Sequence, residues 1–318
     1  MTRIVCEVGS NFRNLADCIY SIGQARAYGA DAVKFQLFSD FELYGYGAQE
    51  DRGVRAEWLP KLKEKADACG IDLMVTAFSP EGVLVVDPYV TVHKVASAEC
   101  CHLGILKAVA ATGKPVYIST GGHGADELKM AIKCLKDHGA GQVTALYCVS
   151  EYPTRRVDVR AFADSVEWGD IIGADQCGFS DHTRDVLGMP QLAALHCASV
   201  IEKHVSFIDD PETADAPHSL NAAEFDEMVR GVRSVREIFA LDPAPCERDM
   251  LERHNRRLMV TVPIAAGEAL AYGVNFGVFR SRTKALGALA PWQYPRVDGR
   301  PAKCDLVPGD EVSPDTVG

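Results

Sequence analysis

The chain has 318 residues, of which 47% are hydrophobic and 24% charged, and its formal net charge is −11. This length and composition allow one large buried core with a small appendage, and the acidic balance, without any long Lys/Arg run, excludes a chain-wide basic surface for nucleic acid or anionic membranes. No apolar stretch reaches the roughly 18–20 residues of a membrane span, and the cysteines show no paired CxxC spacing, so we expect a cytoplasmic protein with free thiols.

Short apolar runs alternate with helical patterns through most of the chain. Eight runs have the character of buried strands: RIVCEVGS, DAVKFQLF, IDLMVTAF, VTVHKVAS, PVYIST, QVTALYCVS, DIIGADQCGFS and ASVIEKHVS. Helical spacing is found between and after them, at Leu15 to Tyr28, Glu57 to Cys69, Ala125 to Asp137, Met189 to Cys197 and Ala222 to Phe239. Near-continuously apolar strands are buried on both faces, and eight strand–helix units predict an α/β fold, the (β/α)8 or TIM barrel.

A domain boundary follows the last of these helices, where the Pro-rich segment from Leu241 to Pro245 cannot continue a helix. We predict a barrel domain over residues 1–245, a linker over 246–255 and a small domain over 256–318. The last segment has short strands broken by turns. A segment this small is not expected to hold a robust core of its own, so we expect it to pack on something else.

Polar residues stand at nearly every predicted strand end, the position from which a barrel builds its active site. They are Glu7, Lys34, Gln36, Thr76, Lys94, Ser97, Glu99, Ser119, Ser150, Tyr152, Ser180, His182, Glu202 and His204. Two lysines within apolar strands, together with several hydroxyls, can bind a small phosphorylated anion. Structural ion pairs with Glu7 or Glu99, or a Schiff-base lysine of an aldolase, are the alternatives.

Two histidines, His182 and His204, stand at the ends of consecutive predicted strands. Both imidazoles can reach one divalent ion at the barrel mouth. An octahedral site completed by water and substrate oxygens suits Mn²⁺ or Mg²⁺, whereas a closed zinc site needs more protein ligands. A hydrogen-bonded structural histidine is the alternative at each position.

The ordered strand-end strings CEVGSN, GADAVKFQ, VTAFS, HKVASAEC, KPVYISTGG, YCVSEYP, GFSDHT and EKHVS resemble the sialic acid synthase family. The tail, from RRLMVTVPIAAGE to CDLVPGDEV, is similar to that family's antifreeze-like (SAF) β-clip domain. The resemblance implies a synthase that joins phosphoenolpyruvate to the aldehyde carbon of an acylamino sugar such as N-acetylmannosamine, giving a nonulosonic acid and phosphate. It also implies a divalent metal, Mn²⁺ ahead of Mg²⁺ or Co²⁺, and a domain-swapped homodimer.

The resemblance also assigns roles to individual residues. Phosphoenolpyruvate would be held by Lys34, Thr76, Lys94, Ser97, Ser119, Ser180 and Ser150, the last standing where the family often has asparagine. His182 and His204 match the metal ligands. The amino sugar would be contacted by Glu7, Glu99, Tyr152, Asp215 and an arginine of the small domain that reaches the partner subunit's site, Arg280 or Arg282. The candidates to orient or deprotonate the attacking water are Glu7, Glu99 and Glu202.

The chain departs from the family at two places that bear on the sugar. After the eighth strand it reads Ala214-Asp215-Ala216-Pro217-His218-Ser219 where the family shows a GPDH-like string, and the loop from Ser39 to Arg55 is short. The identity of the sugar therefore stays open. Two alternative functions also remain: another phosphoenolpyruvate aldol-type synthase that uses a phosphorylated pentose or tetrose, and a non-catalytic carbohydrate-binding paralogue on the same scaffold.

Overall fold

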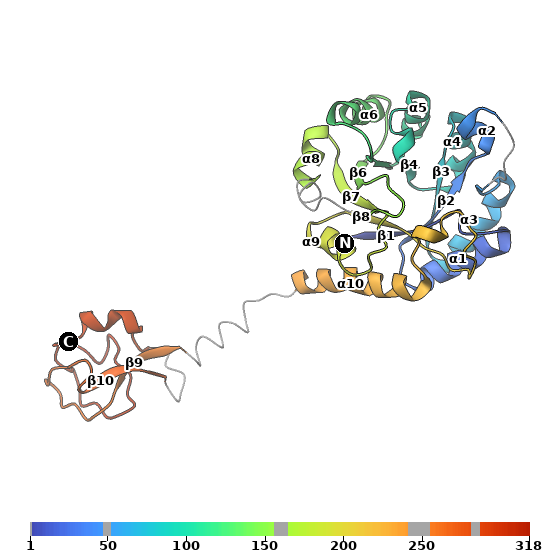
Figure 1. Cartoon of the computed structure of the whole chain (residues 1–318). Coiled ribbons are helices and arrows are strands. Elements are labelled where there is room, and N and C mark those ends of the chain that lie inside the picture. Colours follow the sequence, from blue (N-terminus) through green and yellow to red (C-terminus); the bar gives the residue numbers. More distant parts are fainter. Residues whose placement is uncertain (1, 47–51, 156–164, 241–254, 281–286) are drawn as a thin grey trace. The chain divides into compact units, whose positions relative to one another are not determined.

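The computed structural model describes residues 2–46, 52–155, 165–240, 255–280 and 287–318 (Figure 1). Contacts divide the chain into two compact units, Met1–Phe239 and Ala240–Gly318, which we describe separately. The predicted linker over 246–255 lies outside the described residues except for Asn255. Among the helices of the described ranges, none combines the length and the apolar character that crossing a membrane requires.

The first unit is a closed parallel barrel in which each strand pairs with the next in sequence. Its strands are β1 (Arg3–Gly9), β2 (Ala32–Leu37), β3 (Asp72–Ala77), β4 (His93–Val95), β5 (Val116–Ser119), β6 (Val143–Cys148), β7 (Gln176–Asp181) and β8 (Val200–His204). The barrel closes between β8 and β1, where Glu7 lies opposite His204, and on the other side of β1 Glu7 lies opposite Lys34. The predicted (β/α)8 barrel is confirmed.

Helices follow the strands along the chain and surround the barrel in Figure 1. They are α1 (Leu15–Ala27), α2 (Asp40–Tyr44), α3 (Leu59–Cys69), α4 (Pro80–Val86), α5 (Leu103–Ala111), α6 (Ala125–Asp137), α8 (Ser165–Ile172), α9 (Met189–Leu195) and α10 (Ala222–Ala240), with short 3-10 turns η1 (Ala56–Trp58), η2 (Asp87–Tyr89), η3 (Ser97–Glu99) and η4 (Ala216–His218). The strand predicted from Asp170 was wrong in its first part. Residues up to Ile172 belong to α8, because Gly173 takes a left-handed conformation that ends the helix before the strand begins.

Strand alternation divides the barrel interior into an apolar end and a polar end. A cluster of inward-facing residues fills the apolar end: Val5, Ala32, Met74, Val92, Tyr117, Leu146 and Val200. Side chains two positions further along a strand point to the same side. The inward residues that follow the apolar layer are therefore the polar ones at the C-terminal strand ends, where barrel enzymes place their active sites.

The second unit carries a hydrophobic core of its own, which the sequence did not lead us to expect. Strands β9 (Arg256–Val260) and β10 (Phe276–Arg280) pair antiparallel, and a 3-10 helix, η5, spans Pro291–Arg296. Isolated bridges, such as Ile264 with Leu306, tie distant parts of the segment together. Ten buried residues cluster between these parts, among them Leu258 and Phe276. Short strand pairs and isolated β-bridges thus enclose a hydrophobic core in a small segment that has no long strands.

Candidate active site

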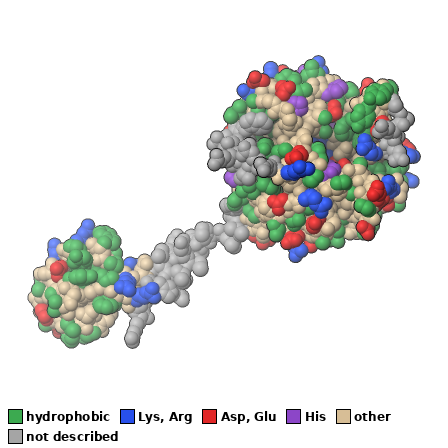
Figure 2. All heavy atoms as spheres, viewed as in Figure 1, with side chains coloured by type: hydrophobic (Ala, Val, Ile, Leu, Met, Phe, Trp, Pro, Cys, Tyr) green, Lys and Arg blue, Asp and Glu red, His purple; other side chains and the backbone are tan. Residues whose placement is uncertain are grey.

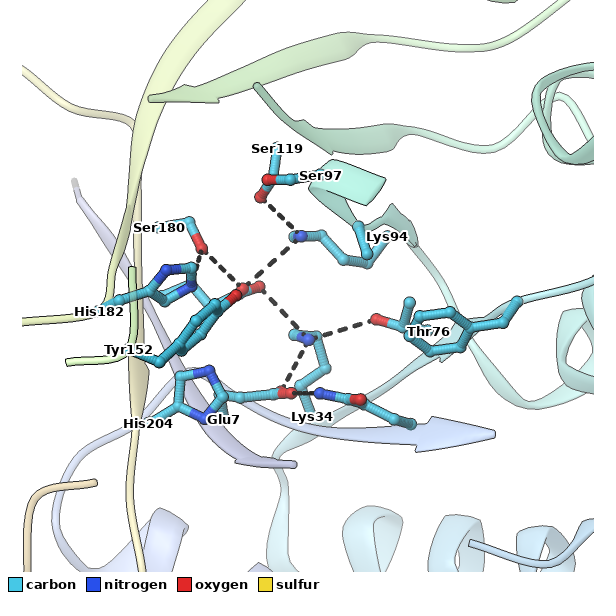
Figure 3. A pocket seen from close by; sticks show the side chains of 14 residues that line it. Glu7, Lys34, Thr76, Lys94, Ser97, Ser119, Tyr152, Ser180, His182 and His204 are labelled. Atoms are coloured by element: carbon cyan, nitrogen blue, oxygen red, sulfur yellow. Dashed lines mark hydrogen bonds and ion pairs between the residues drawn. The ribbon is translucent and has the colours of Figure 1, made fainter. Parts of the chain in front are cut away.

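A polar pocket occupies the C-terminal end of the barrel (Figure 3). Its lining consists of Glu7, Lys34, Gln36, Thr76, Phe78, Lys94, Ala96, Ser97, Ser119, Tyr152, Ser180, His182, Glu202 and His204, and its free volume is about 50 Å³. Each of the eight barrel strands supplies a lining residue or is followed by one. Residues far apart in the chain thus converge at one rim.

Two lysines converge on one carboxylate within this pocket. Lys34 Nζ lies 2.8 Å from Glu7 Oε2 and 3.7 Å from Glu202 Oε2. Lys94 Nζ lies 3.6 Å from Glu202 Oε1. Each ammonium group also donates to a hydroxyl: Lys34 to Thr76 at 3.2 Å, and Lys94 to Ser119 at 2.8 Å. Of the alternatives that the sequence left open, the ion pair of Lys34 with Glu7 is present, and the hydroxyl groups expected beside the two lysines lie within hydrogen-bond distance of them.

Burial and charge pairing act in opposite directions on these four groups. Burial raises the pKa of Glu202, but Lys34 and Lys94 outweigh it and the pKa falls to about 2. Burial also raises the pKa of Glu7, and there the attraction of Lys34 is insufficient, so the pKa stays above its usual value. Burial lowers the pKa of Lys94, and Glu202 only partly restores it. Glu7 is thus the carboxyl group of the pair that most readily takes up a proton.

The two predicted metal-ligand histidines lie beside one another in the pocket lining, with their rings edge to face and the ring centroids 5.5 Å apart. His182 Nδ1 donates to the Val149 carbonyl at 2.9 Å, which leaves Nε2 available as a ligand. Burial lowers the pKa of His182 to about 3, with a further contribution from His204, so its imidazole is neutral. Tyr152 stacks on the His182 ring at a centroid distance of 4.1 Å and fixes its plane.

A buried carboxylate stands between His204 and a third histidine. Asp215 Oδ2 lies 3.5 Å from His204 Nδ1, and Oδ1 lies 3.6 Å from His218 Nε2. The Ser10 amide donates to Oδ2 at 2.9 Å. His204 Nδ1 and His218 Nε2 are buried and have no hydrogen-bond partner among the described residues. One ligand atom from each of the three side chains lies within 4.8 Å of the other two. Donors arranged in this way suit a divalent cation.

No role was predicted for His218. The sequence did offer a signal, because the segment 214–219 departs from the family's GPDH-like string and carries a histidine at position 218. The structure places it in η4, and Asp215 directly before it, beside His204 rather than in the pocket lining. Gln36, which had been given no role, donates to Glu7 at 2.8 Å. Phe78 and Ala96 line the pocket without having been singled out.

Three predicted residues of the barrel unit do not line the pocket: Asp215, described above, Glu99 and Ser150. Glu99 is half-buried in η3 and absent from the lining. Ser150 is exposed at the rim, where its hydroxyl would lie only 2.3 Å from a Cβ atom on Gly121. Arg280 ends β10 in the second unit, and Arg282 lies outside the described residues.

A closed parallel barrel with paired cations and histidines at its C-terminal end is the arrangement of a TIM-barrel enzyme. The NeuB family model matches residues 21–241. An uncharacterised protein of Methanocaldococcus jannaschii, MJ1065, is 31% identical over 280 residues, which cover 85% of this chain and 82% of that protein. The pseudaminic acid synthase of Helicobacter pylori is 28% identical over 295 residues, covering 84% of this chain and 85% of that enzyme.

A solved structure agrees with these sequence matches. The N-acetylneuraminic acid synthetase of Leptospira borgpetersenii, crystallised with citrate, has a TM-score of 0.71 at 25% identity and covers 79% of this chain and 90% of that one. The chain belongs to the NeuB family. Its relatives include synthases of sialic-type acids, which indicates an enzyme of the transferase type.

Proposed function

We propose that this enzyme condenses phosphoenolpyruvate with the aldehyde of an N-acylated amino sugar and releases a nonulosonic acid and phosphate. The observation that carries the proposal is the convergence of Lys34, Lys94, His182 and His204 in one pocket. The lysines and the hydroxyls beside them suit an enol phosphate, and the imidazoles lie where the sugar carbonyl would meet it.

The two substrates would join in balanced steps. C3 of phosphoenolpyruvate attacks the aldehyde carbon, whose oxygen gains a proton, and water adds at C2. The tetrahedral intermediate then loses phosphate by cleavage of its C–O bond. Lys94 and Lys34 would stabilise the charge on the departing phosphate by donating hydrogen bonds to it. Ser119 and Thr76 already hold the two ammonium groups in position.

Among the three carboxyl groups considered for activating water, Glu7 is the best supported. Its raised pKa allows it to accept a proton, whereas a pKa of about 2 makes Glu202 a poor base. Glu99 does not line the pocket. Glu202 would instead balance the two lysines when no anion is bound.

We propose a divalent metal cofactor, Mn²⁺ ahead of Mg²⁺ or Co²⁺, held by His182 and His204. The fit rests on the neutral His182 imidazole and on the group of His204, Asp215 and His218, which brings two ring nitrogens without a hydrogen bond among the described residues close to a carboxylate donor. When bound, the ion would supply a Lewis acid for the sugar carbonyl.

The second unit is proposed to be an SAF domain that caps the barrel of the partner in a domain-swapped homodimer. Its pairing of short strands around a small core supports this fold class. Arg280 or Arg282 would then reach the partner's amino sugar. Full activity of a monomer truncated after Ala240 would contradict the arrangement.

Phosphoenolpyruvate consumption tests the proposed reaction. The assay compares N-acetylmannosamine, its 6-phosphate and a diacetamido-hexose, each with and without a chelator. We expect turnover with an acylamino hexose that the chelator abolishes and Mn²⁺ restores. Chelator-insensitive turnover with a pentose phosphate would instead identify the alternative class of phosphoenolpyruvate synthase.

A further inference from the structure

A second and larger cavity lies on the same face of the barrel as the catalytic pocket. Its volume is about 570 Å³, against about 50 Å³ for the pocket. The residues that line it follow β1 (Ser10, Arg13), precede α3 (Arg52, Arg55, Trp58) or follow β8 (Glu212). A pocket as small as the first cannot enclose a whole amino sugar, so most of that substrate must lie outside it.

Two short contact paths connect the cavity to the catalytic pocket. The Ser10 amide donates to Asp215 Oδ2, the same oxygen that lies 3.5 Å from His204. On the other side, the Val54 amide donates to the Gln36 carbonyl at 2.8 Å, and the Gln36 side chain donates to Glu7. A sugar whose aldehyde lies beside His204 therefore has this cavity directly available for the rest of its chain.

Arginine is the commonest charged side chain in the cavity lining, where Arg13 is paired with Asp210 and Arg55 lies 4.0 Å from Glu57. Three guanidinium groups and one carboxylate, that of Glu212, line it, in a chain whose net charge is −11. Acidic and basic side chains are otherwise interspersed over the face of the barrel unit drawn in Figure 2. Several guanidinium groups around one space are the arrangement that binds a phosphate group by paired hydrogen bonds.

Local contacts hold two of these arginines in place. Arg13 makes two bonds to Asp210, of 2.6 and 3.2 Å, and the Arg55 guanidinium lies over the Trp58 ring at 5.5 Å. Arg52 makes no hydrogen bond or ion pair with any other residue in the part of the chain that the structure describes. The next residue, Gly53, is packed so closely on the end of β2 that a Cβ atom would lie 2.6 Å from the Phe38 carbonyl oxygen. The backbone that carries Arg52 and Arg55 is thereby fixed to the barrel.

We propose that this cavity binds a phosphate monoester at the far end of the sugar substrate. The inference rests on the proposed function, because it takes the aldehyde end of the same sugar to lie beside His204. An acylamino group and hydroxyl groups carry no charge, so arginines in a cavity that adjoins the aldehyde site favour a sugar that is phosphorylated on its terminal hydroxyl. A kinase-type reaction would then have to supply the substrate.

Calorimetry of sugar binding, without phosphoenolpyruvate, tests the proposal apart from turnover. The protein is titrated with N-acetylmannosamine and with its 6-phosphate, and the Arg52→Gln and Arg55→Gln variants are compared with Arg26→Gln, which alters an exposed arginine on α1. We expect the 6-phosphate to bind at least about tenfold more tightly, and each cavity variant to lose most of that preference while Arg26→Gln keeps it.

Equal or absent binding of the two sugars, or an undiminished preference in both cavity variants, would overturn the inference. Arginine-dependent preference for the phosphorylated sugar, in a protein that consumes no phosphoenolpyruvate with either sugar, would support the inference and refute the proposed function. Turnover of N-acetylmannosamine, with no binding preference for its 6-phosphate, would support the proposed function and refute the inference.

Discussion

Replacing Lys94 with Met probes the phosphate half of the site. The Lys94 ammonium group donates to Ser119 at 2.8 Å and lies 3.6 Å from Glu202. Its loss removes a charged donor to the bound phosphate, and a hydrogen bond to a charged group contributes about 1.5–3 kcal/mol. We therefore expect kcat/KM for phosphoenolpyruvate to fall on the order of 10- to 100-fold.

The assay is steady-state consumption of phosphoenolpyruvate at saturating sugar and Mn²⁺. Lys107→Met is the matched control, because Lys107 is exposed on α5, away from the pocket lining. Thermal unfolding of both variants separates loss of binding from loss of fold. A Lys94→Met enzyme whose kcat/KM stays within about twofold of the wild-type value would refute the role given to this lysine.

Three further predictions concern the charges around the pocket. The pKa of Glu202, about 2 in the folded protein, lies below its ordinary value, so its contribution to stability is complete above that ordinary value of about 4.3 and is lost as the pH falls toward 2. Urea unfolding between pH 5 and 3 should therefore depend less on pH in Glu202→Gln, and an unchanged profile would contradict the assignment. His218→Ala should weaken Mn²⁺ binding roughly tenfold by calorimetry, whereas His138→Ala should leave it unaltered; equal affinities would exclude His218 from the metal site. Lys203→Met strands the buried Asp181 carboxylate, 2.7 Å away, and should lower the free energy of unfolding by about 3–5 kcal/mol, while a loss below about 1 kcal/mol would show that Asp181 finds another partner.

The barrel and most of its polar rim could be predicted because both follow from strand periodicity. Alternation places Lys34 above Ala32 and Glu202 above Val200, so apolar runs that end in polar residues indicate an active site. Glu99 shows where this reasoning ends. The strand β4 stops at Val95, and the 3-10 turn after it changes the period, so Glu99 no longer faces the pocket.

The contacts made by loop residues could not be predicted from strand periodicity. Asp215 and His218 meet His204 because η4 folds back over the end of β8, and no periodic pattern encodes that return. Arg13 and Arg55 likewise line one cavity although they lie in loops after different strands. Such contacts depend on tertiary packing, which only the three-dimensional structure reveals.

The central claim is that the lysines, carboxylates and histidines of this pocket serve a condensation in which phosphate leaves by C–O cleavage. Phosphoenolpyruvate labelled with ¹⁸O at the oxygen between C2 and phosphorus tests it directly when turned over with an acylamino sugar. Mass spectrometry should find the label in the released phosphate. Unlabelled phosphate, with the ¹⁸O retained on C2 of the product, would contradict the mechanism.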